Sequence, residues 1–413
     1  MRWASPRCGC WAITMAERPP RRPASGMVNV FFLGMVSFFS DLSTEMVYPL
    51  IPLYLMAAFG ATPALVGVIE GVAESMASLL KVFSGYVSDR FQKKKSLAFW
   101  GYAAGVVYKG ALLIAGSWAG VLGARVLDRI GKGVRTSPRD VLVSESADQA
   151  NMGKAFGLHK ALDMFGSAFG ILATYFLMLG MHDDYNFKRL FAISVIPGVI
   201  GLVLFSFIRE TKAPVPMVRE RFWQGARRID NQLKLYLVVC LVFTLGNSSN
   251  AFLLIRAKSA GFDDVTVILL YFLFNLVASV LAMPLGQLSD RIGRKKLLIP
   301  GYLAFSLCYL GFAFAGNAAT MVVTFVLYGV YTAMIAGVER AFVAEIAPPD
   351  LKGTMLGLQA TVAGVALLPA SVIAGLLWDA FGPRVPFVFG AAASGVAALL
   401  LLLFMRGRPA PHN

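Results

Sequence analysis

Long apolar segments, each of about twenty residues or more, follow one another along nearly the whole 413-residue chain. Hydrophobic residues make up 57% of the sequence and charged residues only 15%. A soluble fold cannot bury that much apolar surface, whereas a bilayer requires one apolar helix of about twenty residues for every crossing. The sequence therefore predicts an all-α polytopic membrane protein.

The apolar segments number twelve and fall into two sets of six. The first set is predicted at 27–58, 63–88, 96–116, 118–138, 153–180 and 189–208. The second set is predicted at 232–257, 264–288, 297–315, 318–345, 353–378 and 384–405. Because a polar, Pro-containing stretch separates the sets, we expect five parts: a leader at 1–26, a six-helix bundle at 27–208, a linker at 209–231, a second six-helix bundle at 232–405 and a tail at 406–413.

Lys and Arg are spread unevenly over the loops. The leader, the even-numbered loops and the tail together hold about 25 of them, and the odd-numbered loops about five. Since basic loops stay on the cytoplasmic side, we expect a plasma membrane protein, in bacteria of the inner membrane, with both termini in the cytoplasm. The net charge of +15 then reflects topology, and no nucleic-acid partner is expected.

Two short patterns occur once in each set of segments. GYVSDRFQKKKSL begins at Gly85, and GQLSDRIGRKKLL begins at Gly286, about 201 residues later. GKAFGLHKA from Gly153 and GTMLGLQAT from Gly353 are separated by about the same distance. Six crossings return the chain to its starting side, so these are two parallel six-helix repeats. Such repeats are typical of carriers with a site between the halves.

The repeated loop pattern resembles the signature between helices 2 and 3 of the major facilitator superfamily, although Gln92 stands where that family usually has glycine. In that family the loop locks the two halves in the outward-open state. The resemblance therefore implies a gating motif, made of Gly85, Asp89, Arg90, Gly286, Asp290 and Arg291. The alternative is a plain cytoplasmic anchor of positive charge.

Gly157, Gly166 and Gly170 in the fifth segment have the spacing of the antiporter signature found in exporters of this superfamily. Ile171 stands where that signature has proline. The pattern therefore indicates either export or ordinary helix packing through small residues.

Four carboxylates lie in the first two apolar segments, Asp41 and Glu45 in the first, Glu70 and Glu74 in the second. Within each pair the residues are four apart and share a helix face. A carboxylate at bilayer depth costs about 2.5–3.5 kcal/mol on insertion scales. Each of the four is therefore either a proton carrier or a fixed countercharge for basic residues of the fourth segment. Asp163 in the fifth segment is a fifth candidate acid.

Charged residues in and after the fourth segment follow steps of three and four and so form one helical stripe: Arg125, Asp128, Arg129, Lys132, Arg135 and Arg139. The stretch DRIGKGVRTSPRD lacks the order and context of a phosphate loop. It resembles the helix-4 signature of the superfamily and, more closely, a prokaryotic branch of mostly uncharacterised permeases. We expect the four deeper residues to line a substrate cavity and the last two to join the gate, unless the stripe is a purely structural ion-pair network.

The remaining candidate cavity residues come from other segments. Asn247 and Asn250 occupy in the second repeat about the position of Asp41 to Glu45 in the first, and Arg340 corresponds to Arg139. His159 is either a proton relay or a hydrogen-bonding residue at the cavity edge.

These patterns predict a secondary active transporter working by alternating access, with proton-coupled efflux of a drug, metabolite or siderophore as the leading expectation. The alternatives are a proton-symporting importer of an organic anion and a lipid or lysolipid flippase. No catalytic cluster, ATP-binding motif, cofactor or metal site is expected, and the four cysteines give no disulfide framework. The expected partners are a small-molecule substrate, protons or another coupling ion, and the bilayer, with the monomer as functional unit.

Overall fold

The computed structural model describes residues 25–91, 94–146, 152–181, 186–210, 231–335, 337–347 and 352–404. Most of the predicted leader, linker and tail lies outside these ranges. The side chains of Gly85, Asp89 and Arg90 are also outside the described part.

The described residues form helices and no strands, which confirms the predicted all-α fold. The first half contains α1 (Ser25–Glu45), α2 (Leu50–Phe59), α3 (Pro63–Phe91), α4 (Lys94–Ile114), α5 (Trp118–Ser146), α6 (Met152–Met181) and α7 (Phe187–Phe205). The second half contains α9 (Asn231–Gly246), α10 (Ala251–Ser259), α11 (Asp264–Ile292), α12 (Arg294–Phe314), α13 (Ala318–Ile335), α14 (Val338–Ile346), α15 (Lys352–Phe381) and α16 (Val385–Phe404).

Three of the predicted crossings are broken into two helices each. The break between α1 and α2 precedes Pro49, which has no amide hydrogen to continue the helical ladder. The break between α9 and α10 falls at the same place in the second repeat, at residues 247–250. A break leaves backbone N–H and C=O groups without their helical hydrogen bonds, which is tolerated at membrane depth only where protein or water surrounds them. These breaks therefore lie in the interior of the molecule, away from lipid.

Eleven helical segments of the described chain are long and apolar enough to cross a bilayer. The predicted fourth crossing, α5, is not among them because of its many charges. It is nevertheless 29 residues long and packs against α1, α3 and α4. Its charged residues Arg125, Asp128 and Arg129 are buried. We therefore count α5 as the twelfth crossing among the described helices, enclosed by apolar ones.

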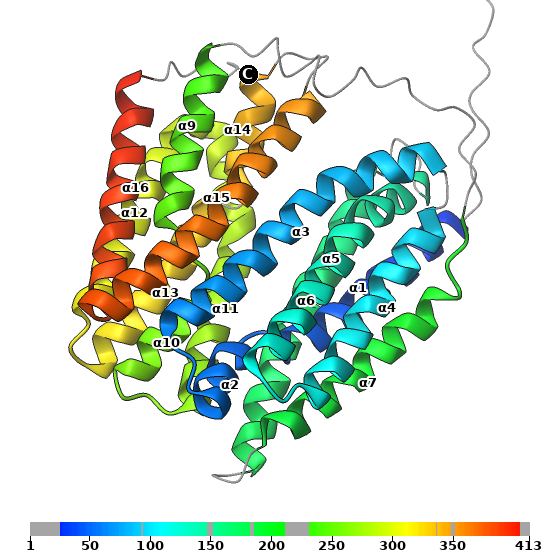
Figure 1. The fold of residues 1–413 in the computed structure, drawn as a ribbon. Coiled ribbons are helices and arrows are strands. Elements are labelled where there is room, and N and C mark those ends of the chain that lie inside the picture. The colour runs from blue at the N-terminus through cyan, green and yellow to red at the C-terminus, as the bar shows by residue number, and fades with distance from the viewer. Residues whose placement is uncertain are drawn as a thin grey trace, which may run out of the picture.

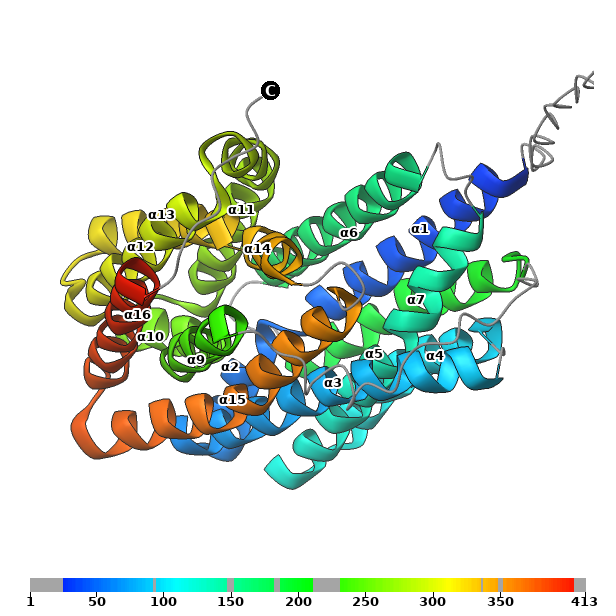
Figure 2. The same ribbon diagram turned by 90° about the horizontal axis from the view of Figure 1, so that it is seen from above.

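The two halves lie beside each other, and their most extensive contacts are those of α3 with α15 and of α6 with α11. Figure 2 shows α15 running alongside α3. The approach of α3 and α15 is very close, because a Cβ atom on Gly67 would lie 2.3 Å from the carbonyl oxygen of Ser371. At the end that carries α2 and α10 the bundles are in contact, and their ribbons diverge toward the end where α9 begins and α16 ends (Figure 1).

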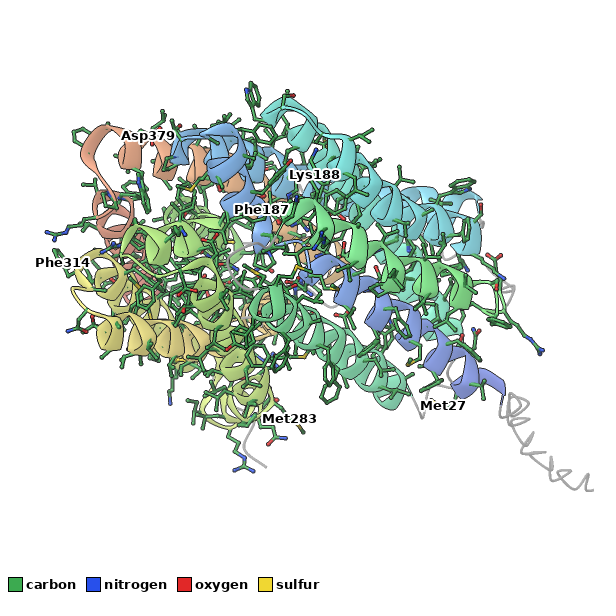
Figure 3. All side chains as sticks on the ribbon, turned by 90° about the horizontal axis from the view of Figure 1, so that it is seen from below. Met27, Phe187, Lys188, Met283, Phe314 and Asp379 are labelled. Carbon is green, nitrogen blue, oxygen red and sulfur yellow. The ribbon has the colours of Figure 1, made fainter. Side chains whose placement is uncertain are left out.

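The outer surface is largely apolar. Met283 and Phe314, exposed by 71% and 64%, project from the helices (Figure 3). Such a surface is expected where helices face lipid rather than water.

Candidate functional site

A buried ion pair joins α3 to α5. The Arg125 guanidinium donates from Nε to Glu70 Oε1 at 2.9 Å and from Nη2 to Glu70 Oε2 at 2.6 Å. The two side chains are only 0% and 1% exposed. A two-pronged hydrogen-bonded pair is the arrangement in which buried opposite charges best offset the loss of water.

One turn further along both helices, a second pair repeats this contact. Arg129 Nη2 lies 2.6 Å from Glu74 Oε1. Asp128 stands between the two arginines, with Oδ2 at 3.7 Å from Arg125 Nη1 and 3.9 Å from Arg129 Nε. The Tyr48 ring faces both guanidinium groups, at 5.2 and 5.5 Å from its centre.

The last part of the α5 stripe contacts α1, α4 and α6. Arg135 lies over the Tyr102 ring at 4.6 Å, with Nη2 at 3.9 Å from Asp41 Oδ1. Arg139 pairs with its neighbour Asp140 at 2.9 Å and lies 3.9 Å from Asp163. The predicted contact of Arg135 and Arg139 with Asp89 involves a side chain outside the described part.

Asp163 is held by several groups. Lys160 Nζ lies 2.7 Å from its Oδ2, and the Ser37 hydroxyl donates to its Oδ1 at 3.1 Å. The neighbouring His159 is buried, and its Nε2 has no hydrogen-bond partner among the described residues.

Glu45 stands apart from the other acids of the first half. It forms no ion pair with a described residue, and its hydrogen-bond donor comes from the second half, where the Tyr271 hydroxyl of α11 lies 3.5 Å from Oε2. The rings of Tyr48 and Tyr271 are 6.0 Å apart beside it. Lys132, on the same stripe as Arg129, also has no ion pair among the described side chains.

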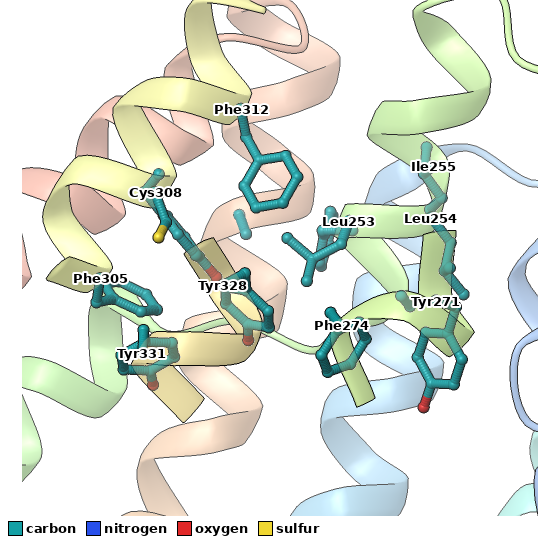
Figure 4. Packing of buried hydrophobic residues seen from close by; sticks show 14 of the residues in the cluster. Leu253, Leu254, Ile255, Tyr271, Phe274, Phe305, Cys308, Phe312, Tyr328 and Tyr331 are labelled. Carbon is teal, nitrogen blue, oxygen red and sulfur yellow. The ribbon is translucent and has the colours of Figure 1, made fainter. Parts of the chain in front are cut away.

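The second half presents neutral and aromatic groups instead. Asn247 donates to the Tyr331 hydroxyl at 3.4 Å, and the Tyr328 hydroxyl donates to Asn250 Oδ1 at 2.8 Å. Figure 4 shows Tyr328 and Tyr331 beside Phe274 and Phe305 in one aromatic cluster. The two halves therefore differ in chemistry at equivalent positions, as the sequence indicated.

The second copy of the loop pattern is tied to α14. Arg294 lies 3.3 Å from Asp290 and 3.1 Å from Glu345, and it donates to the Ala341 carbonyl at 2.9 Å. Gly286 precedes this cluster on α11, and Arg291 and Arg340 are exposed. The candidate site residues of the loop therefore lie at the surface end of the helices, away from the α3–α5 pairs.

Sequence reasoning missed Lys109 on α4, which is 1% exposed and donates to the Gly105 carbonyl at 2.8 Å. The feature of the sequence that could have indicated it is a lone lysine inside an apolar segment. It also missed Tyr271, since nothing in the sequence shows that α11 approaches α1.

The glycines of α6 serve close packing. A Cβ on Gly166 would lie 2.3 Å from the Phe38 carbonyl oxygen, and one on Gly170 would lie 2.4 Å from that of Leu42. Gly157 has open space around it. The packing interpretation of this spacing therefore has direct geometric support.

Comparison with known proteins agrees with this architecture. The chain matches the family model described as Major Facilitator Superfamily over residues 33–255 and 235–413. It is 34% identical over 380 residues to an uncharacterised MFS-type transporter of Methanocaldococcus jannaschii, covering 91% of this chain and 94% of that protein. Over 134 residues it is 29% identical to the class H tetracycline resistance protein of Pasteurella multocida, covering 32% of this chain and 33% of that protein.

The fold is also similar to solved transporters. The crystal structure of the nucleoside transporter NupG superimposes with a TM-score of 0.74 at 11% sequence identity, covering 91% of this chain and 98% of that one. Twelve crossings, two parallel repeats and a family match along the whole helical region agree with one another. The chain therefore belongs to the major facilitator superfamily of membrane transporters.

Proposed function

We propose that this transporter couples efflux of a small organic molecule to the entry of protons, and that Glu45 is the carboxylate that takes up and releases the proton. The observation that carries the proposal is the contact of Glu45 with Tyr271, a hydrogen bond between the two halves at a carboxylate without an ion pair among the described residues.

The other candidate acids are less suited to this role. Glu70 and Glu74 each lie 2.6 Å from an arginine nitrogen, which fits them for the role of countercharges to α5. The partners of Asp41 and Asp163 among the described residues all belong to the first half. Glu45 differs because its partner belongs to the half that must move during alternating access.

Protonation of Glu45 changes what it can do in this contact. The carboxylate only accepts hydrogen bonds, whereas the protonated acid also donates one. Proton binding therefore alters the contact between the halves directly, and a ligand that favours one conformation shifts the equilibrium by its differential affinity.

The direction of transport is inferred from a relative. The partial similarity to a tetracycline resistance protein favours efflux. Asn247, Asn250, Tyr328 and Tyr331 offer hydrogen-bonding groups and ring faces, which suit a neutral or aromatic compound. Arg125 and Arg129 are already paired, which leaves them less available to an anionic substrate.

A second candidate is import of an organic anion by proton symport. Lys132 favours it, because this cation of the α5 stripe has no ion pair among the described side chains and could hold an anionic group. Replacing Lys132 with Gln would then abolish transport of anions, whereas efflux of neutral aromatic compounds would persist.

The test uses purified full-length protein in proteoliposomes with an imposed pH gradient and tetracycline and ethidium as probes. We expect gradient-driven movement of at least one probe by the native protein. Glu45→Gln should lose the dependence on the gradient but keep exchange at equal pH, and Asp263→Asn, at the exposed start of α11, should behave as native. Transport by native protein that ignores the gradient would refute proton coupling.

A further inference from the structure

We propose that Glu339 of α14 is a second proton-binding site, located in the C-terminal half and separate from Glu45. The inference extends the proposed function, because it rests on proton coupling and adds a second group that carries a proton. Glu339 is the acid that accompanies Arg340 in the tenth crossing, and no role in proton binding follows from its position in the sequence.

The surroundings of Glu339 provide one strong hydrogen-bond donor and no direct countercharge. The Tyr302 hydroxyl of α12 donates to Glu339 Oε1 at 2.9 Å. Glu339 forms no ion pair with a described residue, although Arg294 and Glu345 pair two turns further along α14 at 3.1 Å. The Glu339 carboxyl group is therefore stabilised by a hydrogen bond from a neutral phenol and not by an ion pair.

The side chains of α9, α12 and α13 that lie near this carboxyl are neutral. Tyr302 comes from α12, Tyr236 and Cys240 from α9, and Tyr331 from α13. The only charged side chain that the structure describes on α15 is Asp379, which accepts from the Ala64 amide at the far end of that helix. Arg340, the next residue of α14, is an exposed cation and acts on Glu339 from a greater distance than an ion pair.

A structural role alone explains this arrangement less well. Glu339 lies in the first turn of α14, where a negative charge is favoured by the helix dipole. Glu339 is half-buried, and the dipole and a single tyrosine replace only part of the hydration that its ionised form loses there. A protonated carboxyl group loses far less hydration energy. The aromatic surroundings therefore suit a group that can be either protonated or ionised.

The repeat gives a second, independent argument. Since Arg340 corresponds to Arg139, the equivalent of Glu339 in the first half is Pro138, which cannot bind a proton. The first half has Glu45 on α1 instead, where the second half has Asn247 and Asn250. Each half then carries a carboxyl that accepts from a tyrosine hydroxyl and forms no ion pair among the described residues, Glu45 and Glu339, on non-equivalent helices. The transport cycle is expected to move two protons.

Infrared difference spectroscopy of full-length protein in lipid, titrated with pH in light and heavy water, tests this inference. The probe is the proton itself, read from the carbonyl stretch of protonated carboxyl groups. Glu339→Gln keeps an acceptor for Tyr302 and should remove one titrating band that Glu45→Gln leaves in place. Glu345→Gln, on the same helix but paired with Arg294, is the matched control and should leave that band unchanged.

The outcomes separate the two proposals. A Glu339→Gln spectrum identical to that of the native protein overturns the second site, whatever happens at Glu45. Loss of the band in Glu339→Gln without any change in Glu45→Gln supports Glu339 and contradicts the role of Glu45. If Glu339→Gln fails to fold, Tyr302→Phe replaces it, because loss of the phenol must shift the frequency of the Glu339 band. An unshifted spectrum then overturns the site.

Discussion

Arg125 and Glu70 are joined by two parallel hydrogen bonds inside the first half, and both side chains are shielded from solvent. Removing one member leaves the other charged and buried. We expect Arg125→Met to lower the free energy of unfolding by about 3–5 kcal/mol, which is the usual cost of breaking a buried pair. The unfolding midpoint of purified protein in detergent measures this.

The double variant Arg125→Met with Glu70→Leu removes both charges and should recover most of the lost stability. The exposed Lys188→Met serves as control and should change the unfolding free energy by less than about 0.5 kcal/mol. A double variant as unstable as the single one would show that the pair contributes more than charge compensation.

Replacing the glycines of α6 with alanine, one at a time, should give variants of graded stability. Gly166→Ala and Gly170→Ala should each destabilise by about 1–3 kcal/mol, because the added methyl group meets the α1 backbone. Gly157→Ala has room for its methyl group and should be neutral or slightly stabilising, since Ala favours a helix by up to about 1 kcal/mol over Gly. Equal unfolding midpoints for all three variants would contradict this close approach of α6 and α1.

The contact of Asp379 with the Ala64 amide, at 3.3 Å, joins α15 to α3. Cysteines introduced together at Ala64 and Asp379 should form a disulfide under mild oxidation, detected by mass spectrometry of the linked peptides. Cys240 and Cys308 are buried and should not interfere. We expect the disulfide to stop transport of the probes and a reductant to restore it, because alternating access must separate these ends. Full transport by the cross-linked protein would disprove that requirement, and each single cysteine variant is a control.

Asp263 caps the start of α11 by accepting from the Thr266 amide at 3.1 Å. Partial burial opposes the charged form, but the hydrogen bonds from Thr266 outweigh it and hold the pKa of Asp263 below its ordinary value. The cap therefore stabilises the fold above the ordinary Asp pKa of about 3.9, and this contribution disappears as the pH falls through the lower folded-state value.

Asp263→Ala should cost about 1 kcal/mol at neutral pH. Asp263→Asn keeps a capping oxygen and should cost little, but its stability should no longer depend on pH in the acidic range. Thermal unfolding measured at several pH values checks both statements. An Asn variant with the same acid dependence as the native protein would assign that dependence to other groups.

The positions of the helices could be predicted closely from the sequence, because bilayer thickness fixes the length of an apolar segment. Pro49 precedes α2 at the break in the first crossing, where its missing amide hydrogen interrupts the helical hydrogen bonds. The break between α13 and α14 was not predicted, since residues 318–345 contain no proline. α5 extends to Ser146, beyond the predicted end at 138, because Leu142, Val143 and Ser146 of its final turns are buried against neighbouring helices.

The partners within the site could not be derived in the same way. Asp41, Glu45, Glu70 and Glu74 follow the same spacing of four, so the sequence alone does not show which acids meet Arg125. That choice depends on the rotation of α3 and α1 about their axes, which is set by packing along their whole length. Tyr271 reaches Glu45 from more than two hundred positions away, and only the approach of the two halves brings them together.

The charge content of α5 has a consequence for the synthesis of the protein. A helix with Arg125, Asp128, Arg129 and Lys132 near its middle is too polar to enter the bilayer alone, at about 2.5–3.5 kcal/mol for each central charge. Its counterions Glu70 and Glu74 belong to α3, which leaves the ribosome earlier. We therefore expect α5 to enter the bilayer together with α3, with the ion pairs formed during insertion. Assembly of the first bundle therefore requires that the acids of α3 are in place when the basic residues of α5 enter the bilayer.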